Sequence, residues 1–468
     1  MQIKVCMPDF QKNKTEVKNE NRKRHVGFKP AFDCGTHRNG LCSDGQCRRK
    51  NTNISSITEK LTIIKIGDGI SEAMPETTEK SSLDIPDSIE KYDLFTLDIQ
   101  KMRDLLISDK KIPVTIDGVS YSMNLSEMEV NAPDVKSQTY SYVGNLEDTK
   151  DSEVVLTISE RVLIARINVN GIDYVIESTP DKSKSGRIIH YSHRSTDVKD
   201  DGSSLNTEED YLAHKYYSDE ELKQRDDEAK IEEERINSKS STKSLTPVRI
   251  RVFTDNQWIS DEPDWLAKAQ DIIAELNNQF QRSDIFIRFY AHYDTSKASA
   301  LSSDSQHITS PCDSIIRQVP IEYLNSNHED IALYLGGYDS SYIGIAATYG
   351  YDCPNPLQRR YAWVQMKDDP SSYDGVHEDR AKATIHEIGH IFDADHQQGE
   401  QSSGQGESYN RAYQWTENLI FTKQTVMWTP ILKSNTFEVS SNDYHGDYYC
   451  NNALRIYETK NIVASYAN

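Results

Sequence analysis

The sequence has no apolar run approaching the roughly eighteen residues that a membrane-spanning helix needs. Hydrophobic residues make up 36% and charged residues 27% of its 468 residues, a composition typical of a globular protein with a polar surface. The first residues, MQIKVCMPDFQKNKTEVKNENRKR, also lack the apolar core of a secretory signal peptide. We therefore expect no membrane-spanning segment. We also expect either that the protein is not exported by the signal-peptide route or that its natural start lies elsewhere.

Basic residues are in deficit, with 53 Lys and Arg against 74 Asp and Glu and a net charge of −21. Such a surface repels phosphate, which argues against a nucleic-acid partner. The first 50 residues run the other way, with 12 basic and 5 acidic side chains. Because these charges are scattered and the arm is short, they do not indicate a nucleic-acid tail.

Cysteine is sparse, and residues 48–311 contain none. The seven cysteines are an odd number, so at least one thiol has no partner within the chain. The cluster CGTHRNGLCSDGQC (34–47) fits a disulfide knot or a loose loop, and its spacing is less suited to a zinc knuckle. Among Cys312, Cys353 and Cys450 we expect one bridge and one remaining thiol.

Composition divides the chain into four segments. Residues 1–55 are polar, basic and Cys-containing, and residues 56–195 are rich in Val and Ile and are expected to be mostly β. Residues 196–245 carry dense mixed charge and are interpreted as a solvated helix and flexible linker, open to a cut near 235–246. Residues 246–468 have an α/β pattern, and there is no internal repeat.

Local signals predict several elements. Asn170-Gly171 lies between two Val/Ile-rich runs and predicts a hairpin, because both residues tolerate the positive φ of a type I′ turn. Apolar alternation and helical spacing predict the elements of the α/β part. These are strands over 247–254, 284–293 and 330–337, helices over 261–280 and 312–325, and two further strands within 342–350 and 360–366.

The segment ATIHEIGHIFDADHQQG (383–399) collects three of the 13 histidines. If residues 381–392 form a helix, Ile385, Ile388 and Phe392 make a buried stripe. His386 and His390 are then four residues apart and project from one face, where one metal ion can bind both. Glu387 lies beside that face, which is the H-E-x-x-H arrangement of zinc hydrolases.

A third histidine follows the helix. His396 is six residues after His390, so the chain must turn back for its imidazole to reach the same ion. Asp393 stands where this turn is expected, and Asp is among the non-glycine residues best able to adopt the left-handed conformation. A histidine at one given position arises by chance about 3% of the time in a sequence with this composition. The spacing therefore predicts a metal site made of His386, His390 and His396.

The chain resembles the metzincin zinc peptidases, and within them the adamalysin (reprolysin) branch. The resemblance rests on HEIGHIFDADH (386–396), on IGIAATYGYDCPNPLQRRYAWVQ (343–365) and on TVMWTP (425–430). It covers about residues 246–468 and extends diffusely to a prodomain-like 80–195. It implies an α/β (α+β) catalytic domain with a mixed, mostly parallel sheet and a long active-site helix, preceded by a β-rich prodomain.

The same resemblance implies roles for further residues. Met427 matches the Met-turn beneath the metal, and the segment around residues 344–350 matches the substrate-edge strand. The implied substrate-binding residues are Gly344, Ile345, Ala346 and Ala347 on that strand and Trp428, Thr429 and Pro430 after the methionine. The chain departs from the family pattern at Asp393, where Gly is usual, at Gln397, where Asp is usual, and in having no prodomain cysteine to cap the metal.

Together these features predict a zinc-dependent endopeptidase that hydrolyses protein or peptide substrates by a metal-activated water, with Glu387 as general base. The resemblance implies a zymogen located extracellularly or at the cell surface. Two alternatives remain. A different zinc peptidase class would use a downstream glutamate, Glu407 or Glu417, as the third ligand, and a non-catalytic protein would use zinc and the groove only to bind a partner.

Overall fold

The computed structural model describes residues 62–74, 83–108, 111–199, 206–207, 245–304, 311–339, 342–346, 360–366, 376–397, 410–417, 421–429, 435–442, 445–447 and 450–467. Residues Lys60–Asn468 cluster as one compact unit. The linker expected over 196–245 and its predicted cut near 235–246 lie almost wholly outside the described residues, as do Cys353 and the N-terminal cysteines. The predicted domain boundaries and disulfide therefore stay predictions.

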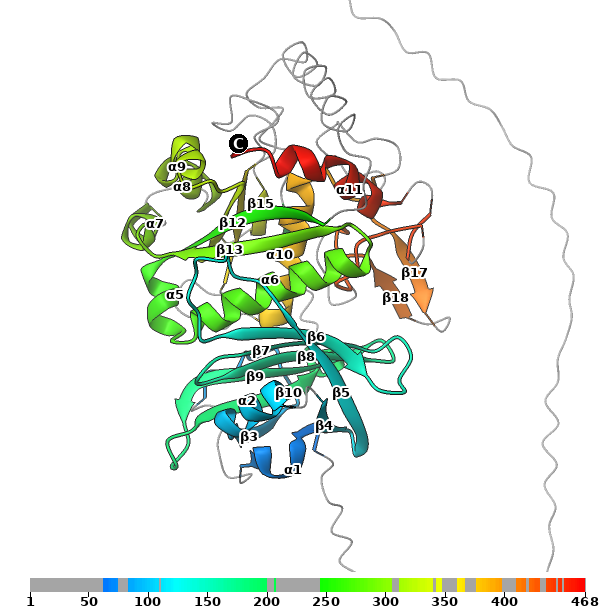
Figure 1. Ribbon diagram of the computed structural model, residues 1–468. Coiled ribbons are helices and arrows are strands. Elements are labelled where there is room, and N and C mark those ends of the chain that lie inside the picture. The colour runs from blue at the N-terminus through cyan, green and yellow to red at the C-terminus, as the bar shows by residue number, and fades with distance from the viewer. Residues whose placement is uncertain are drawn as a thin grey trace, which may run out of the picture. The chain divides into compact units, whose positions relative to one another are not determined.

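The larger sheet of the described chain has ten strands in the order β1-β4-β5-β6-β7-β8-β9-β10-β3-β2 (Figure 1). Every pair of neighbours in it is antiparallel. Its strands are β1 (Ile64–Ile66), β2 (Ser71–Ala73), β3 (Asp93–Leu97), β4 (Lys111–Ile116), β5 (Val119–Met128), β6 (Tyr140–Leu146), β7 (Glu153–Ile158), β8 (Leu163–Val169), β9 (Ile172–Lys182) and β10 (Ile188–Arg194). The helices α1 (Gly67–Ile70) and α2 (Ile99–Ser108) accompany it.

The fold class predicted from the sequence is wrong for this chain. It made an α/β domain with a mostly parallel sheet the dominant architecture, whereas the largest sheet is the antiparallel ten-stranded one and strands outnumber helices in the described residues. The physical reason is that the strands of this sheet bury alternate side chains in a core of their own, as β8 does with Leu163, Ala165, Ile167 and Val169. The β-rich region is thus a principal layer of the fold rather than an accessory to it.

The second sheet has six strands in the order β11-β15-β16-β14-β12-β13. Its strands are β11 (Asn206–Thr207), β12 (Thr246–Thr254), β13 (Ile287–Asp294), β14 (Ile331–Leu335), β15 (Tyr342–Ala346) and β16 (Tyr361–Val364). The pair β15–β16 is antiparallel, and the other pairs of neighbours are parallel. This sheet carries the strands expected over 247–254, 284–293 and 330–337.

Residues from earlier in the chain cover both edges of this sheet. At one edge β11 pairs in parallel with β15, placing Thr207 opposite Gly344. At the other edge the Ala291 amide of β13 donates to the Val130 carbonyl at 2.8 Å, and the Ala132 amide donates to the Ala291 carbonyl at 3.0 Å. An exposed edge offers unpaired amides to any other chain, and these segments occupy them.

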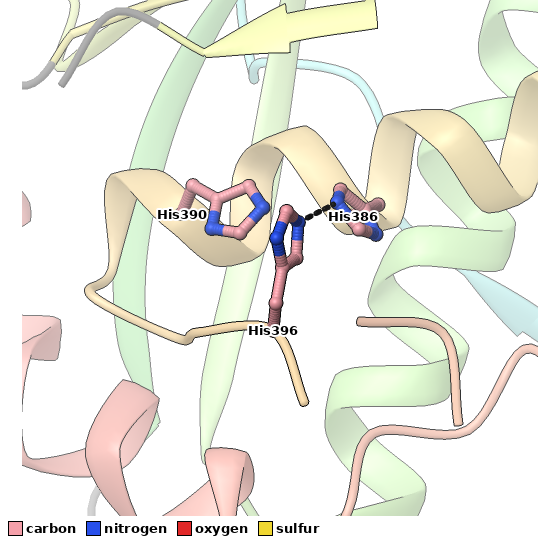
Figure 2. Close-up of side chains that lie close together, drawn as sticks. All are labelled: His386, His390 and His396. Carbon is pink, nitrogen blue, oxygen red and sulfur yellow. Dashed lines mark hydrogen bonds between the residues drawn. The ribbon is translucent and has the colours of Figure 1, made fainter. Parts of the chain in front are cut away.

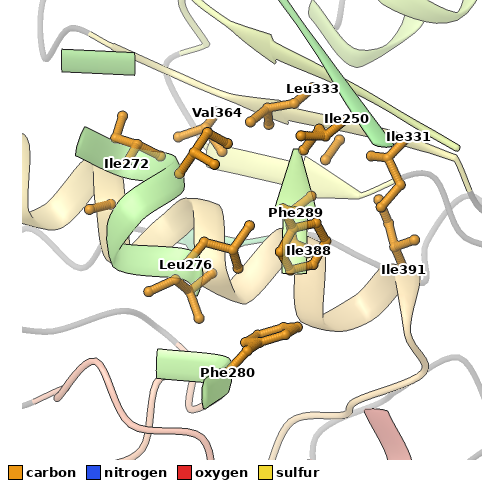
Figure 3. Packing of buried hydrophobic residues seen from close by; sticks show 14 of the residues in the cluster. Ile250, Ile272, Leu276, Phe280, Phe289, Ile331, Leu333, Val364, Ile388 and Ile391 are labelled. Carbon is orange, nitrogen blue, oxygen red and sulfur yellow. The ribbon is translucent and has the colours of Figure 1, made fainter. Parts of the chain in front are cut away.

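Two long helices pack against the six-stranded sheet. These are α6 (Trp265–Arg282) and α10 (His377–Ile391), and α10 carries the H-E-x-x-H motif. Their apolar side chains meet those of the central strands in the main hydrophobic core (Figure 3). Figure 3 shows Ile388 and Ile391 of α10 within the same core as Phe289 of β13. The buried stripe fixes which face of α10 turns away from the sheet, and so positions its polar residues.

The remaining elements are short. They are the helices α5 (Asn256–Asp261), α7 (Ala298–Asp304), α8 (Pro311–Gln318), α9 (Ile321–Ser326) and α11 (Asn452–Val463), the 3-10 turn η2 (Ser195–Asp197) and the hairpin of β17 (Gln414–Glu417) with β18 (Phe421–Gln424). The single helix expected over 312–325 is two helices separated at Pro320, since proline cannot continue a helix. In the described part of the chain, no helix combines the length and apolarity needed to cross a membrane.

The predicted hairpin turn is confirmed. Asn170 and Gly171 have φ of 53° and 79°, and Val169 pairs with Ile172 across the turn between β8 and β9. The next pairs along these two strands continue the same register. The Asn-Gly signal was sufficient here because the turn is decided by two adjacent residues.

Buried ion pairs join the ten-stranded sheet to α6. Arg166 of β8 donates to both carboxylate oxygens of Glu275 on α6, at 2.8 and 2.7 Å, and also contacts Glu153 of β7. The Glu153 carboxylate is shared with Arg282, near the end of α6. Arg166 and Glu275 are only 5% and 3% exposed as side chains, so separating the two layers would leave uncompensated charges.

His190 of β10 couples the stability of the ten-stranded sheet to pH. Its Nε2 accepts the Leu163 amide at 3.1 Å, which requires the neutral ring, and burial lowers its pKa from 6.5 to about 4. Because the unfolded chain takes up this proton first, the free energy of unfolding should fall as pH drops from 6.5 to 4. One such group contributes about 3 kcal/mol.

We expect His190→Gln to flatten this part of the pH profile, since glutamine keeps an acceptor that does not titrate. Guanidinium unfolding of the full chain at pH 7, 5.5 and 4 measures the slope. Equal slopes for the wild type and the variant would contradict the assignment.

Candidate metal centre

The helix α10 presents its motif from a buried position. It begins after Val376 with Glu378 and Asp379 in its first turn, where the helix dipole favours acidic side chains. His386 and Glu387 are fully buried, and His390 is 3% exposed. Apolar neighbours on α10 face the sheet core, so the histidines point to the opposite side, toward the chain that follows the helix.

Three histidine rings converge there. The ligand atoms of His386, His390 and His396 all lie within 4.8 Å of one another (Figure 2). The Nε2 atoms of His386 and His396 are 3.1 Å apart, and the three pairs of ring centroids are separated by 4.6, 5.1 and 5.0 Å. Two nitrogens bound tetrahedrally to one zinc ion at ordinary bond lengths would be roughly 3.3 Å apart. These rings could therefore hold one metal ion.

Backbone carbonyls orient two of the rings. The Nδ1 of His386 lies 2.8 Å from the Val426 carbonyl, and the Nδ1 of His390 lies 2.7 Å from the Ala394 carbonyl. A carbonyl only accepts, so each Nδ1 carries a hydrogen, and in the neutral ring Nε2 is the atom with the free lone pair. Metal-binding histidines are commonly held in this way by an acceptor on the other nitrogen.

The chain reverses where the sequence predicted. Asp393 has φ of 68°, in the left-handed region, and this expectation is confirmed. The Asp393 amide donates to the His390 carbonyl at 2.9 Å, and the Ala394 amide donates to the Gly389 carbonyl at 3.0 Å. This pattern closes a helix with a left-handed residue and sends the chain back along the helix.

Two glycines let other elements approach the motif closely. A Cβ on Gly344 of β15 would lie 2.6 Å from Oε1 of Glu387, so the strand backbone runs directly against this carboxylate. A Cβ on Gly389 would lie 2.5 Å from Sδ of Met427. Met427 is fully buried, and it packs against the helix between the two motif histidines. Any side chain at either glycine would push a site residue aside.

The other predicted substrate-binding residues are only partly described. Ile345 and Ala346 lie on β15 with Gly344, and Trp428 and Thr429 are half-buried after Met427. Ala347 and Pro430 lie outside the described residues, as does Glu407, and the side chain of Glu417 is not described either. Trp428 packs against the hydrophobic core that also contains Ile343 of β15. The structure brings Gly344 to the motif. The substrate-binding role of the seven residues stays a prediction.

Sequence reasoning missed the role of Gln397. Its amide nitrogen donates to the Thr429 carbonyl at 2.5 Å, and its amide oxygen accepts the Thr429 amide at 3.0 Å. Gln397 thus ties the residue after the third histidine to the segment after Met427. The one signal in the sequence was that Gln397 occupies the position where the resemblance expects Asp. The carbonyls of Val426 and Ala394 carry no side-chain signal at all.

Comparisons with known proteins are sparse. No protein-family model and no curated protein matches the chain. Among solved structures, the crystal structure of metalloproteinase-II from Bacteroides fragilis aligns with 71% of this chain and 88% of that chain, at 15% identity and a TM-score of 0.37. At this identity and TM-score, the likeness to a protein named a metalloproteinase establishes neither the fold nor the function of this chain. The adamalysin branch is not confirmed.

Loss of one ring should abolish tight metal binding. We expect His396→Ala to weaken zinc binding by more than about 100-fold, beyond the usual effect of losing a supporting contact to a ligand. Elemental analysis after dialysis and competition with a chromophoric chelator measure it. The control is His328→Asn, an exposed position at φ 55° that asparagine tolerates. Equal zinc content in the two variants would remove His396 from the site.

Proposed function

We propose that this protein is a zinc-dependent endopeptidase that hydrolyses peptide bonds of protein substrates. The proposal is carried by one observation, the convergence of three imidazoles beside the buried carboxylate of Glu387. His386, His390 and His396 would hold the ion, and Glu387 would act as general base. We also propose that the protein works outside the cell or at its surface.

The donor set suits zinc. Three neutral nitrogen ligands leave the fourth position open, which distinguishes catalytic from structural zinc sites. When bound, zinc would lower the pKa of a water molecule and polarise a substrate carbonyl. The backbone acceptors at Val426 and Ala394 fix the orientation of two of the rings, so little reorganisation is needed on binding.

Glu387 would accept and then donate the proton that is transferred during hydrolysis. It follows His386 directly on α10, and the strand backbone at Gly344 limits where its carboxylate can go. In this role one Oε takes a proton from the attacking water and then delivers it to the departing amine nitrogen. A carboxylate confined in this way loses little conformational freedom during the reaction.

The substrate would lie along β15. An extended peptide can add to a sheet edge through main-chain hydrogen bonds, and Gly344 brings that edge against Glu387. The neighbouring position on β15 is held by β11 of the same chain. His396 is 4% exposed and Glu387 is fully buried. We therefore propose a zymogen that becomes active once the covering residues move.

The second candidate is a zinc-bearing protein that binds a peptide without cleaving it. The same edge strand and histidines would serve it. It has no use for a general base, whereas Glu387 is present and fully buried beside the histidines. The endopeptidase is therefore the better supported function.

Substitution of Glu387 separates the two functions. We expect Glu387→Gln to lower hydrolysis of denatured casein by about 100-fold or more, since general-base catalysis contributes that much, while zinc content is unchanged. Both proteins are assayed as full chains and after trace trypsin treatment, because the five Lys and two Arg of residues 208–244 offer cleavage sites. No casein cleavage by the wild type under either condition would favour the binding protein.

Gly344→Ala tests the contact between β15 and Glu387. The added methyl would displace the carboxylate, and a misplacement of about 1 Å costs roughly 100-fold in rate. Zinc content should not change, because no ligand is touched. The control is Ile343→Val, which alters the adjacent position on the same strand. Full activity of Gly344→Ala would rule out a catalytic position of Glu387 against this strand.

A further inference from the structure

The helix α11 lies against the reversal that follows α10. Three of its side chains, those of Asn452, Arg455 and Thr459, bond to three successive parts of the reversal, from Phe392 to Asp395. Their spacing of three and four residues places them on one face of the helix. The partners are 57 to 67 residues away in sequence, so this contact is made only in the folded chain.

Asn452 grips the residue immediately before the third histidine. Its Oδ1 accepts the Asp395 amide at 3.0 Å, and its Nδ2 donates to the Asp395 carbonyl at 3.1 Å. Both backbone groups of one peptide position are thereby held by one fully buried amide. Such a two-point contact fixes the direction in which the chain enters His396.

Arg455 holds the turn residue itself. Its Nε and a terminal nitrogen both donate to Oδ2 of Asp393, at 2.8 and 2.5 Å. The side chains are 12% and 6% exposed, so the pair is largely shielded from water. A positive φ costs aspartate more conformational energy than glycine, and this ion pair compensates for that cost. It gives a physical reason for aspartate at a turn where glycine is the simpler choice.

Thr459 secures the end of the metal-binding helix. Its hydroxyl donates to the Phe392 carbonyl at 2.7 Å, one of the carbonyls that a helix leaves without an intrahelical partner. Arg411 adds an ion pair to the Asp395 carboxylate at 2.7 Å from another segment. Phe392, Asp393 and Asp395 are thus each held by a side chain of the C-terminal part of the chain.

We propose that Asn452 and Arg455 are positioning residues of the metal site. By fixing Asp393 and Asp395 they hold the His396 ring where it meets His386 and His390, so that metal affinity depends on a helix more than fifty residues downstream. This inference rests on the proposed zinc site and adds to it the element that assembles the third ligand. Ordinary packing of α11 would stabilise the fold without affecting the metal selectively.

Metal affinity of the full chain tests the proposal. We expect Asn452→Leu to weaken zinc binding by about 10–100-fold, the range for losing supports of metal ligands. Asn452→Asp keeps one acceptor and should fall between this variant and the wild type. Leu454→Ala, at a 40% exposed position of α11, is the control and should bind like the wild type. The visible absorption of the Co²⁺-loaded proteins reports whether the coordination geometry changes.

The Arg455 pair provides a rescue that a purely structural role would not give. Arg455→Met leaves Asp393 strained and buried, and should weaken zinc binding by about 10-fold. Adding Asp393→Gly removes both the strain and the unpaired charge, so the double variant should regain most of the affinity. Circular dichroism confirms folding before each titration.

Two outcomes would overturn the proposal in different ways. Wild-type zinc affinity and an unchanged Co²⁺ spectrum in every α11 variant would show that the helix only packs, and the proposed function would stand. A wild-type chain that binds neither zinc nor Co²⁺ would remove both this inference and the proposed endopeptidase.

Discussion

The convergence of the three histidines depends on the reversal of the chain at Asp393. A helix can present two imidazoles four residues apart to one ion, but its rise carries any third ligand beyond reach. The third ring must come from chain that has left the helix and turned back. A single residue with φ of 68° makes that turn, and hydrogen bonds from the end of the helix close it. The positions of the three rings follow from this one backbone conformation.

The three histidine rings are buried, so their polar atoms need partners within the protein. Rings exposed by 4% or less must have their protons directed by protein groups, and the carbonyls of Val426 and Ala394 do this for two of them. Elsewhere in the interior the chain buries charge in pairs, as Arg166 and Glu275 show. Both solutions obey the same rule, because an unsatisfied polar group in a medium of low polarity is costly. The three histidines differ in that their ring nitrogens converge on one another rather than on an opposite charge.

Features decided by neighbouring residues could be predicted from the sequence. The Asn170-Gly171 turn, the strand at residues 247–254, the helix with His386 and His390 and the left-handed Asp393 all depend on local preferences. The size and antiparallel order of the ten-stranded sheet could not be predicted, because strand pairing is decided between distant segments. The hydrogen bonds from Gln397 to Thr429 and from Asn452 to Asp395 could not be predicted either, because they also join distant segments.

The edges of the six-stranded sheet show why the two layers belong to one folding unit. Val130–Ala132 pairs with β13 at one edge, and β11 pairs with β15 at the other. Each pairing satisfies backbone groups that would otherwise be exposed. Arg166 and Glu153 of the ten-stranded sheet also form ion pairs with residues of α6. The strand that carries Gly344 is therefore completed by the preceding part of the chain. A peptide can pair with this edge of β15 only where β11 does not. A peptide that reached Glu387 along β15 would therefore have to displace β11 from the six-stranded sheet.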